Sequence, residues 1–384
     1  AAVWCATGAV ASPLSPEEQR MVEWIDAHGE DAIALLEETV NISSGTMNHD
    51  GVRKVGDVLR RELDALGLET EWIDLPPEME RAGHLFGRKV SGSGKKFVLI
   101  GHLDTVFEAD DDFQGFARDG DTATGPGVED MKGGNVVIVY ALKALQEIGA
   151  LQDIPVVVAY TGEEEKMGRP LAVSRKDLVE AGKWADYGLG FESAITYDDA
   201  DWGTIARRSS SDWTLTVEGR QAHSSGIFGA NAGAGAIFEA SRILNAFYEE
   251  VRGEEHLTFN AGTILGGTDV EYSSGQNRGT TFGKTNVIPR MAVVHGGIRT
   301  ISQDQLERAQ AAMRAIVKNN LPHTTATIEF SEGYPPMFPS EGNRGVLAVL
   351  SEVNEDLGRG PMQELDPSKR GAADVSFVSP HTDA

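Results

Sequence analysis

The chain has 384 residues, 40% of them hydrophobic, and its 34 basic residues against 59 acidic residues give a formal net charge of −25. This length allows two domains. The acidic balance argues against nucleic acid and against an anionic membrane as partners. No apolar run reaches the roughly 20 residues that a membrane-spanning helix needs. The single cysteine, Cys5, excludes an internal disulfide and a thiolate-rich metal cluster, so any metal ion must be held by His, Asp and Glu.

The first residues resemble the end of a secretory signal peptide. They are apolar and finish with Ala9-Val10-Ala11 before Ser12, which is the A-x-A pattern of a cleavage site. We therefore interpret residues 1–11 as a signal-peptide remnant and expect a secreted or periplasmic protein. The alternative is a frayed or tag-derived terminus on a cytoplasmic protein.

From Ser15 onward, helical and strand patterns alternate. Ser15, followed by proline and two acids, is typical of a helix N-terminus. The predicted helices cover residues 15–28, 31–40, 52–66 and 133–148, and the predicted strands cover residues 97–100, 154–160 and 187–191. Such alternation indicates an α/β fold with a mostly parallel sheet covered by helices.

The pattern changes after about Arg207. Strands are predicted at 213–217, 257–265, 291–299 and 324–330, and helices at 230–248 and 305–319. Their order, βαββαβ, is ferredoxin-like. Because apolar helical sequence resumes at 346–357, we predict that residues 207–332 form an inserted domain. Residues 12–206 and 333–384 would then form the two parts of the first domain.

Acids and a histidine follow the predicted buried strands. His102 and Asp104 end the first strand in I-G-H-L-D-T-V, and their i, i+2 spacing places them on one face. For this pair alone, a buried histidine satisfied by a carboxylate is the plainer interpretation. Further acids lie in G-P-G-V-E-D-M-K-G-G at 125–134, T-G-E-E-E at 161–165 and F-E-S at 191–193.

Parallel strands bring their carboxyl ends to one edge of a sheet, where open α/β sheets bind ligands. The acids after these strands can therefore converge with His102. Clustered carboxylates repel one another, and a divalent cation relieves that repulsion. Imidazole and carboxylate ligands suit zinc, with manganese or cobalt as substitutes.

Taken together, these motifs resemble the zinc-dependent amidohydrolases and exopeptidases that include glutamate carboxypeptidase, succinyl-diaminopimelate desuccinylase, acetylornithine deacetylase and aminoacylase. The resemblance covers nearly the whole chain from about Ser15, and G-R-Q-A-H-S-S and N-V-I-P in the inserted region support it. It implies a zinc-hydrolase catalytic domain with an inserted ferredoxin-like dimerisation domain. It also implies a homodimer with two zinc ions per subunit.

The resemblance implies a set of metal ligands. His102 and Glu192 would bind one zinc ion, Glu165 would bind the other, and Asp130 would bridge both. The family also has a last histidine ligand after a segment like G-A-A-D-V-S-F-V at 371–378. His381 is the only candidate in this chain. We favour the alternative that the true ligand lies beyond the last residue, which would make the second metal site incomplete.

Two further residues receive catalytic roles from the resemblance. Asp104 would orient His102 through its other ring nitrogen. Glu164 would be the general base that deprotonates a metal-activated water. The register of T-G-E-E-E could slip by one, with Glu163 as the base and Glu164 as the ligand. The family pattern of an acid before a Glu-Glu pair favours the later register.

The inserted domain contributes three substrate-binding candidates by resemblance. His223 would reach the active site of the partner subunit and stabilise the developing oxyanion. Asn286 would bind substrate, and Arg299 would grip a substrate carboxylate. The structural alternatives are that His223 caps a helix and that Arg299 pairs with a surface acid.

We therefore predict a dinuclear zinc hydrolase that cleaves an amide or peptide bond next to a free carboxylate. The segment at 125–134 favours the glutamate carboxypeptidase branch, with a small peptide or N-acyl amino acid as substrate. An N-acyl amino acid deacylase is the alternative within the same class. A non-catalytic, metal-stabilised dimeric binding protein is the alternative from another class.

Overall fold

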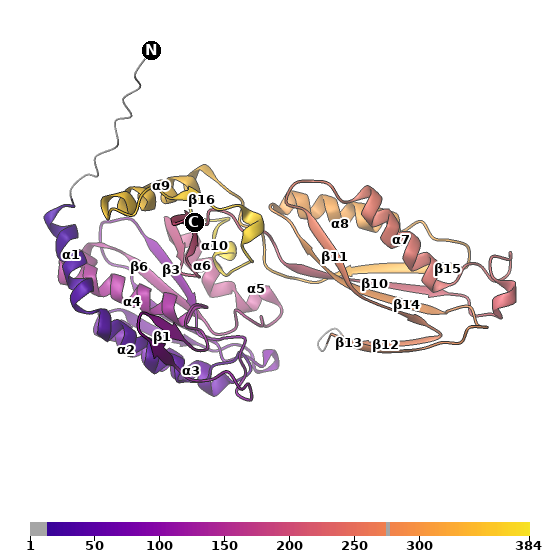
Figure 1. The fold of residues 1–384 in the computed structure, drawn as a ribbon, viewed down its shortest axis with the longest axis horizontal. Coiled ribbons are helices and arrows are strands. Elements are labelled where there is room, and N and C mark those ends of the chain that lie inside the picture. The colour runs from indigo at the N-terminus through magenta and orange to yellow at the C-terminus, as the bar shows by residue number, and fades with distance from the viewer. Residues whose placement is uncertain (1–13, 274–276) are drawn as a thin grey trace, which may run out of the picture. The chain divides into compact units, whose positions relative to one another are not determined.

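The computed structural model describes residues 14–273 and 277–384 and divides the chain into two compact units (Figure 1). Unit 2 comprises Ala206–Phe338 and Asp366–Ala372, and unit 1 holds the other described residues. The predicted inserted domain at 207–332 falls inside unit 2, and its exact boundaries stay predictions. The predicted signal-peptide remnant at 1–11 lies outside the described residues.

Unit 1 is an α/β unit in which short connections join helices to strands. Its helices are α1 (Pro16–Ala27), α2 (Gly29–Val40), α3 (His49–Ala65), α4 (Lys132–Glu147), α5 (Leu171–Ser174), α6 (Lys176–Trp184), α9 (Glu341–Asp356) and α10 (Val375–Val378). Its strands are β1 (Glu69–Ile73), β2 (His84–Lys89), β3 (Phe97–His102), β4 (Ala117–Asp119), β5 (Thr122–Thr124), β6 (Val156–Thr161), β7 (Tyr187–Gly190), β8 (Ile195–Tyr197), β9 (Ala200–Gly203) and β16 (Gln363–Glu364).

A five-stranded sheet in the order β1-β2-β6-β3-β7 lies at the centre of unit 1. Strand β3 pairs in parallel with β6 and β7, whereas β2 is antiparallel to β1 and β6. Four strands therefore run in one direction, which confirms the mostly parallel sheet. Because β3, β6 and β7 are parallel neighbours, the residues that follow them meet at one edge.

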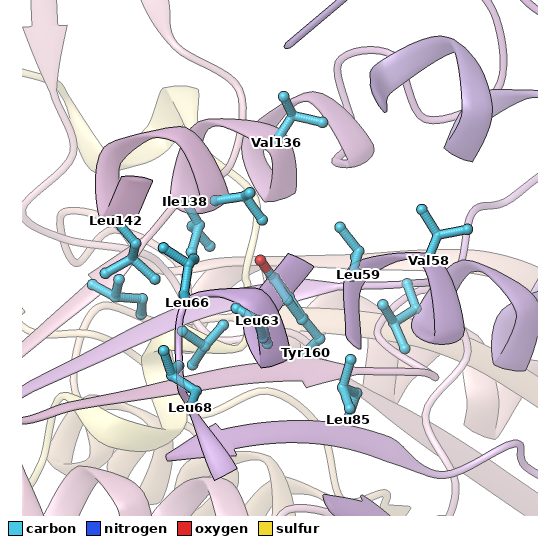
Figure 2. Close-up of a cluster of buried hydrophobic side chains, with 14 of the residues drawn as sticks. Val58, Leu59, Leu63, Leu66, Leu68, Leu85, Val136, Ile138, Leu142 and Tyr160 are labelled. Atoms are coloured by element: carbon cyan, nitrogen blue, oxygen red, sulfur yellow. The ribbon is translucent and has the colours of Figure 1, made fainter. Parts of the chain in front are cut away.

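Helices α3 and α4 cover the sheet with a buried apolar layer (Figure 2). Leu59 and Leu63 of α3 lie with Ile138 of α4 and Tyr160 of β6 in this core, and all four are fully buried. The apolar spacing of α3 matches the helical period, so one stripe faces the core. This layer stabilises the strands whose ends carry the polar residues.

Two glycines allow α4 to approach those strand ends closely. A Cβ on Gly101 of β3 would lie 2.0 Å from Oδ1 of Asn135, and one on Gly134 of α4 would lie 1.9 Å from the carbonyl oxygen of Phe191. No larger residue fits at either position without moving backbone or a buried side chain. His102 follows Gly101 and Glu192 follows Phe191, so both residues are held near the start of α4.

Unit 2 has the predicted ferredoxin-like topology. Its elements are β10 (Ser211–Gly219), α7 (Ala236–Glu250), β11 (Thr258–Gly267), β12 (Asp269–Ser273), β13 (Arg278–Phe282), β14 (Met291–Arg299), α8 (Gln303–Val317) and β15 (Thr324–Phe330). The antiparallel sheet has the order β11-β14-β10-β15, and α7 and α8 pack on it. The hairpin β12–β13 is an addition that the sequence analysis did not predict.

The helix predicted at 230–248 begins later than expected, at Ala236. Gly233 and Gly235 have φ angles of +71° and +79°, in the left-handed region. That backbone is incompatible with a right-handed helix, so residues before Ala236 form turns instead. Within the described ranges, no helix is long and apolar enough to cross a bilayer.

We predict that Leu59→Ala lowers the free energy of unfolding by about 2–5 kcal/mol, because it removes a fully buried side chain and leaves a cavity. Leu350→Ala is the matched control, since Leu350 is 50% exposed on α9 of the same unit and its loss should change stability by at most about 0.5 kcal/mol. Urea unfolding followed by circular dichroism checks both values. Equal effects of the two substitutions would contradict the described core.

Candidate active site

Three side chains from separate parts of the sequence converge beyond the carboxyl end of β3. Nε2 of His102 lies 3.0 Å from Oδ1 of Asp130 and 4.0 Å from Oε1 of Glu192. One ligand atom from each of these residues lies within 4.8 Å of the other two. His102 ends β3, Asp130 precedes α4 and Glu192 follows β7, so the sheet edge and the start of α4 create this group.

The buried carboxylate of Asp104 organises the residues around this group. It lies 3.3 Å from Nδ1 of His102 and accepts a hydrogen bond from Oγ1 of Thr46 at 2.6 Å. It also accepts the backbone N–H groups of Glu164 at 3.0 Å and Glu165 at 3.1 Å. One side chain therefore positions both the histidine ring and the loop that carries the two glutamates.

The ring of His102 has a defined orientation. Its Nδ1 faces two acceptors, the carboxylate of Asp104 and the backbone oxygen of the same residue at 3.0 Å. Nδ1 therefore carries a hydrogen, and Nε2 points toward Asp130 and Glu192. A histidine that donates through one nitrogen to a carboxylate and offers the other is the usual arrangement of a metal ligand.

The pKa values reflect strong charge interactions. Burial alone would lower the pKa of His102, but hydrogen bonds to Asp104 and Asp130 outweigh burial and raise it well above its usual value. Burial raises the pKa of Glu165 to about 7, with added repulsion from neighbouring carboxylates and an opposing effect of His102. Burial likewise raises the pKa of Glu164 well above its usual value. Without a bound cation, these carboxylates are held together at an electrostatic cost.

The donor set fits a divalent cation. Around tetrahedral zinc, with bonds about 2.1 Å long, neighbouring ligand atoms lie about 3.4 Å apart, close to the 3.0 and 4.0 Å distances from Nε2 of His102. One imidazole and two carboxylates also leave a coordination position for water. Glu165 and His381 are not members of the group, and no second group of this kind occurs within residues 14–273 and 277–384. His381 is exposed.

The first of the three consecutive glutamates has a different environment from the other two. Glu163 is fully buried and accepts hydrogen bonds from Nη1 of Arg175 and from the backbone N–H of Gly168. Nε of Arg175 donates to Asp374 at 2.8 Å, and Oγ1 of Thr161 donates to the same carboxylate at 2.5 Å. The sequence analysis missed Arg175 and the role of Asp374, because no local pattern links positions so far apart.

In unit 2, the structure brings His223 and Asn286 into adjacent segments. The backbone N–H of Ser224 donates to the carbonyl of Asn286 at 2.9 Å, and both His223 and Asn286 are exposed. Nδ1 of His223 accepts the backbone N–H of Ser225 at 3.2 Å, so this histidine does cap a short 3-10 turn. In the neutral ring the hydrogen is then on Nε2, which remains available as a donor.

Arg299 ends β14 in the same unit. Burial, followed by the nearby positive charge of Arg299, lowers the pKa of Arg208. Within the described part of the chain, Arg299 forms no ion pair with an acid. The structural alternative of a surface ion pair therefore has no support in unit 2.

Comparison with known proteins identifies the relatives of the chain. A family model described as a peptidase dimerisation domain matches residues 205–325. Carboxypeptidase G2 from Pseudomonas sp. (strain RS-16) is 27% identical over 364 residues, covering 90% of this chain and 78% of that protein. Succinyl-diaminopimelate desuccinylase from Gluconobacter oxydans is 25% identical over 366 residues, covering 91% and 87%. The structure of aminopeptidase PepT from Bacillus cereus matches with a TM-score of 0.68 at 19% identity, covering 92% and 87%.

Unit 2 thus matches the M20 peptidase dimerisation domain, and over most of its length the chain is similar to a carboxypeptidase and to desuccinylases. The chain is a hydrolase that acts on amide bonds. The resemblance and the fold class predicted from its motifs are confirmed, and the non-catalytic binding protein is set aside. The relatives are named as a carboxypeptidase and as desuccinylases, so two substrate classes are represented among them.

We predict that Asp104→Asn weakens zinc binding about 10–100-fold, because the amide cannot accept all the hydrogen bonds that hold His102 and the glutamate loop. Competition with a chromogenic chelator measures the affinity. Asp57→Asn, a change at an exposed position of α3, is the matched control and should leave zinc affinity unchanged. Unaltered affinity in Asp104→Asn would refute the positioning role of Asp104.

Proposed function

We propose that the protein is a zinc-dependent exopeptidase that cleaves an amide bond next to a free carboxylate, as a glutamate carboxypeptidase does. The observation that carries this proposal is the group of His102, Asp130 and Glu192 beside the loop that carries Glu164. The similarity to carboxypeptidase G2 over 90% of the chain supports this substrate class.

The residues of unit 1 can divide the work of amide hydrolysis. A bound zinc ion lowers the pKa of water and polarises the substrate carbonyl. Glu164 accepts a proton from the attacking water and passes it to the leaving nitrogen, a role typically worth about 10²–10⁴-fold in rate. Asp104 fixes the position of Glu164 relative to His102, because its carboxylate contacts both the ring of His102 and the backbone of Glu164.

The surroundings of Glu163 support the register in which Glu164 is the base and Glu165 a metal ligand. The carboxylate of Glu163 is buried against Arg175, so it is engaged in an ion pair. Glu164 and Glu165 are only half-buried and belong to the electrostatic cluster around His102. A base must exchange protons with water and substrate, which a fully buried, ion-paired carboxylate does poorly.

We further propose two zinc ions per subunit, with Asp130 bridging them and Glu165 on the second ion. Glu165 lies near the carboxylates of Asp104, Asp130 and Glu192, and a second cation would relieve the repulsion among them. Cobalt or manganese, which accept the same ligands, are possible substitutes. A secreted or periplasmic location is proposed from the Ala9-Val10-Ala11 pattern alone.

For unit 2, we propose a homodimer in which His223 of the partner subunit stabilises the oxyanion of the reaction. The match to a peptidase dimerisation domain supports the dimer, and the Nε2 hydrogen of the exposed His223 suits the role. Asn286 and Arg299 are proposed to bind the substrate, with the guanidinium of Arg299 facing its carboxylate.

A second candidate function is deacylation of an N-acyl amino acid. Four of the curated relatives are named succinyl-diaminopimelate desuccinylase, with identities of 24–30% to this chain. The same metal group and the same base serve this reaction, because it also hydrolyses an amide. Both kinds of substrate carry a free carboxylate on the amine side of the amide. The two candidates differ in the acyl group, which in a succinylated substrate bears a carboxylate of its own.

We predict that the zinc-loaded protein hydrolyses dipeptides ending in glutamate faster than N-succinyl-diaminopimelate, and that Glu164→Gln lowers kcat by about 10²–10⁴-fold because the base is lost. Initial rates and zinc content by elemental analysis check both statements. Glu352→Gln, an exposed change on α9, is the control for substitution of a glutamate. A preference for the succinylated substrate would favour the deacylase, and full activity of Glu164→Gln would refute the assigned base.

We also predict that two inactive variants complement each other. In a purified heterodimer of Glu164→Gln and His223→Ala subunits, one site keeps Glu164 and receives an intact His223 from its partner. About half of the wild-type activity per dimer should return, because one of the two sites is complete. Activity assays of the doubly tagged heterodimer measure this. An inactive heterodimer, or a fully active monomer, would contradict the role of His223 across the interface.

A further inference from the structure

A buried group of one cation and two anions lies next to the proposed active site. The side chain of Arg175, 1% exposed, donates through Nη1 to Glu163 and through Nε to Asp374. The side chains of Glu163 and Asp374 are 0% and 4% exposed. Arg175 lies at the junction of α5 and α6. The three residues are thus joined away from water, although they are far apart in the sequence.

The two carboxylates belong to different walls of the proposed site. Glu163 is bonded along the chain to Glu164, the proposed base. Asp374 lines the same small cavity as His102 and Glu192, and it is also held by Oγ1 of Thr161 at the end of β6. Arg175 is therefore a direct link between the loop of the base and the wall that faces the metal ligands.

A second arginine, Arg81, also holds this loop. Nε of Arg81 donates to the carbonyl of Lys166 at 2.6 Å and lies 3.8 Å from the carboxylate of Glu163. Its Nη1 donates to the carbonyl of Met79 at 3.1 Å. The loop that carries Glu163, Glu164 and Glu165 is therefore held by Arg81 and by the hydrogen bonds from its backbone to Asp104. Arg175 connects Glu163 of this loop to Asp374, and Thr161, which precedes the loop, contacts the same carboxylate.

The chemistry of this group suits positioning better than stabilisation. Burying two carboxylates and a guanidinium removes hydration that their attraction only partly repays, and apolar residues of similar volume often stabilise a protein equally well. Guanidinium presents its donors in a rigid plane, so it holds two carboxylates at a set separation, which the single ammonium of lysine does not do.

We propose that Arg175 is a positioning residue for amide hydrolysis, which holds Glu163 and Asp374 at a fixed separation and thereby sets Glu164 relative to His102 and Glu192. This inference rests on the proposed function, in which Glu164 is the base. Arg175 does not touch the substrate; it acts through the loop that carries Glu164. A shift of about 1 Å in a reacting group is enough to cost on the order of 10²-fold in rate.

Two variants test the proposal. Arg175→Lys keeps the charge but loses the planar pair of contacts. The triple variant Glu163→Gln/Arg175→Met/Asp374→Asn removes all three charges of the group, and Arg81 keeps its hydrogen bonds to the carbonyls of Lys166 and Met79. We expect kcat to fall about 10–100-fold in both, with KM within about twofold of wild type because Arg175 acts away from the substrate. Zinc content and thermal midpoint should remain near those of the wild type in the triple variant.

Arg242→Met is the matched control. It removes the ion-pair partner of Glu239, another fully buried carboxylate, in unit 2. It should lower the thermal midpoint and leave kcat unchanged. The proposal would be overturned if kcat fell only in proportion to the loss of stability in all variants. It would also be overturned if neither Arg175 variant folded, because the group would then serve stability alone.

Adding the triple substitution to the Glu164→Gln variant tests the role of Arg175 separately from the role of Glu164 as the base. If the triple substitution acts by placing the base, it should cause no further loss of the residual kcat once that base is gone. A further loss of the same size would mean that Arg175 acts through something other than Glu164 and would overturn the proposal. If Glu164→Gln alone kept full activity, the proposed function would fail before this test. If it abolished activity while the triple variant remained fully active, only the role of Arg175 would fail.

Discussion

The arrangement of the site depends on one buried carboxylate, that of Asp104. It is surrounded by donors from three segments: the ring of His102, the hydroxyl of Thr46 and the backbone N–H groups of Glu164 and Glu165. Burial would raise the pKa of Asp104, but these hydrogen bonds outweigh burial and lower it, so the carboxylate stays charged in the interior. A charge in this position requires all its donors, and this requirement ties the strand end to the glutamate loop.

Two groups of side chains lie around Asp104: the candidate metal ligands and the buried ion-pair group of Arg175. The group of His102, Asp130 and Glu192 meets at the sheet edge because β3 and β7 are parallel neighbours. Behind the glutamate loop, Arg175 joins Glu163 to Asp374. Close packing of α4 on the strands keeps these elements together.

Long periodic elements were predictable because their patterns are local. The limits of β14 and β15 were predicted to the residue, and α4 to within one residue at each end. The start of α7 was predicted too early, because the left-handed conformations of Gly233 and Gly235 interrupt the helix although the apolar pattern continues. The strands β1 and β2 and the hairpin β12–β13 were missed, since antiparallel pairing with neighbours rather than local pattern stabilises these strands.

The sequence by itself determined the residue types of the site and their order, because H-x-D, the paired glutamates and the later glutamate are local motifs next to strands. It left the register of T-G-E-E-E between two interpretations. Tertiary structure separated Glu163 from its neighbours by burying it against Arg175, and it gathered His102, Asp130 and Glu192 from separate segments. Such contacts depend on how the chain closes on itself, since Glu163 and Asp374 become neighbours only when β6 and the segment before α10 pack together.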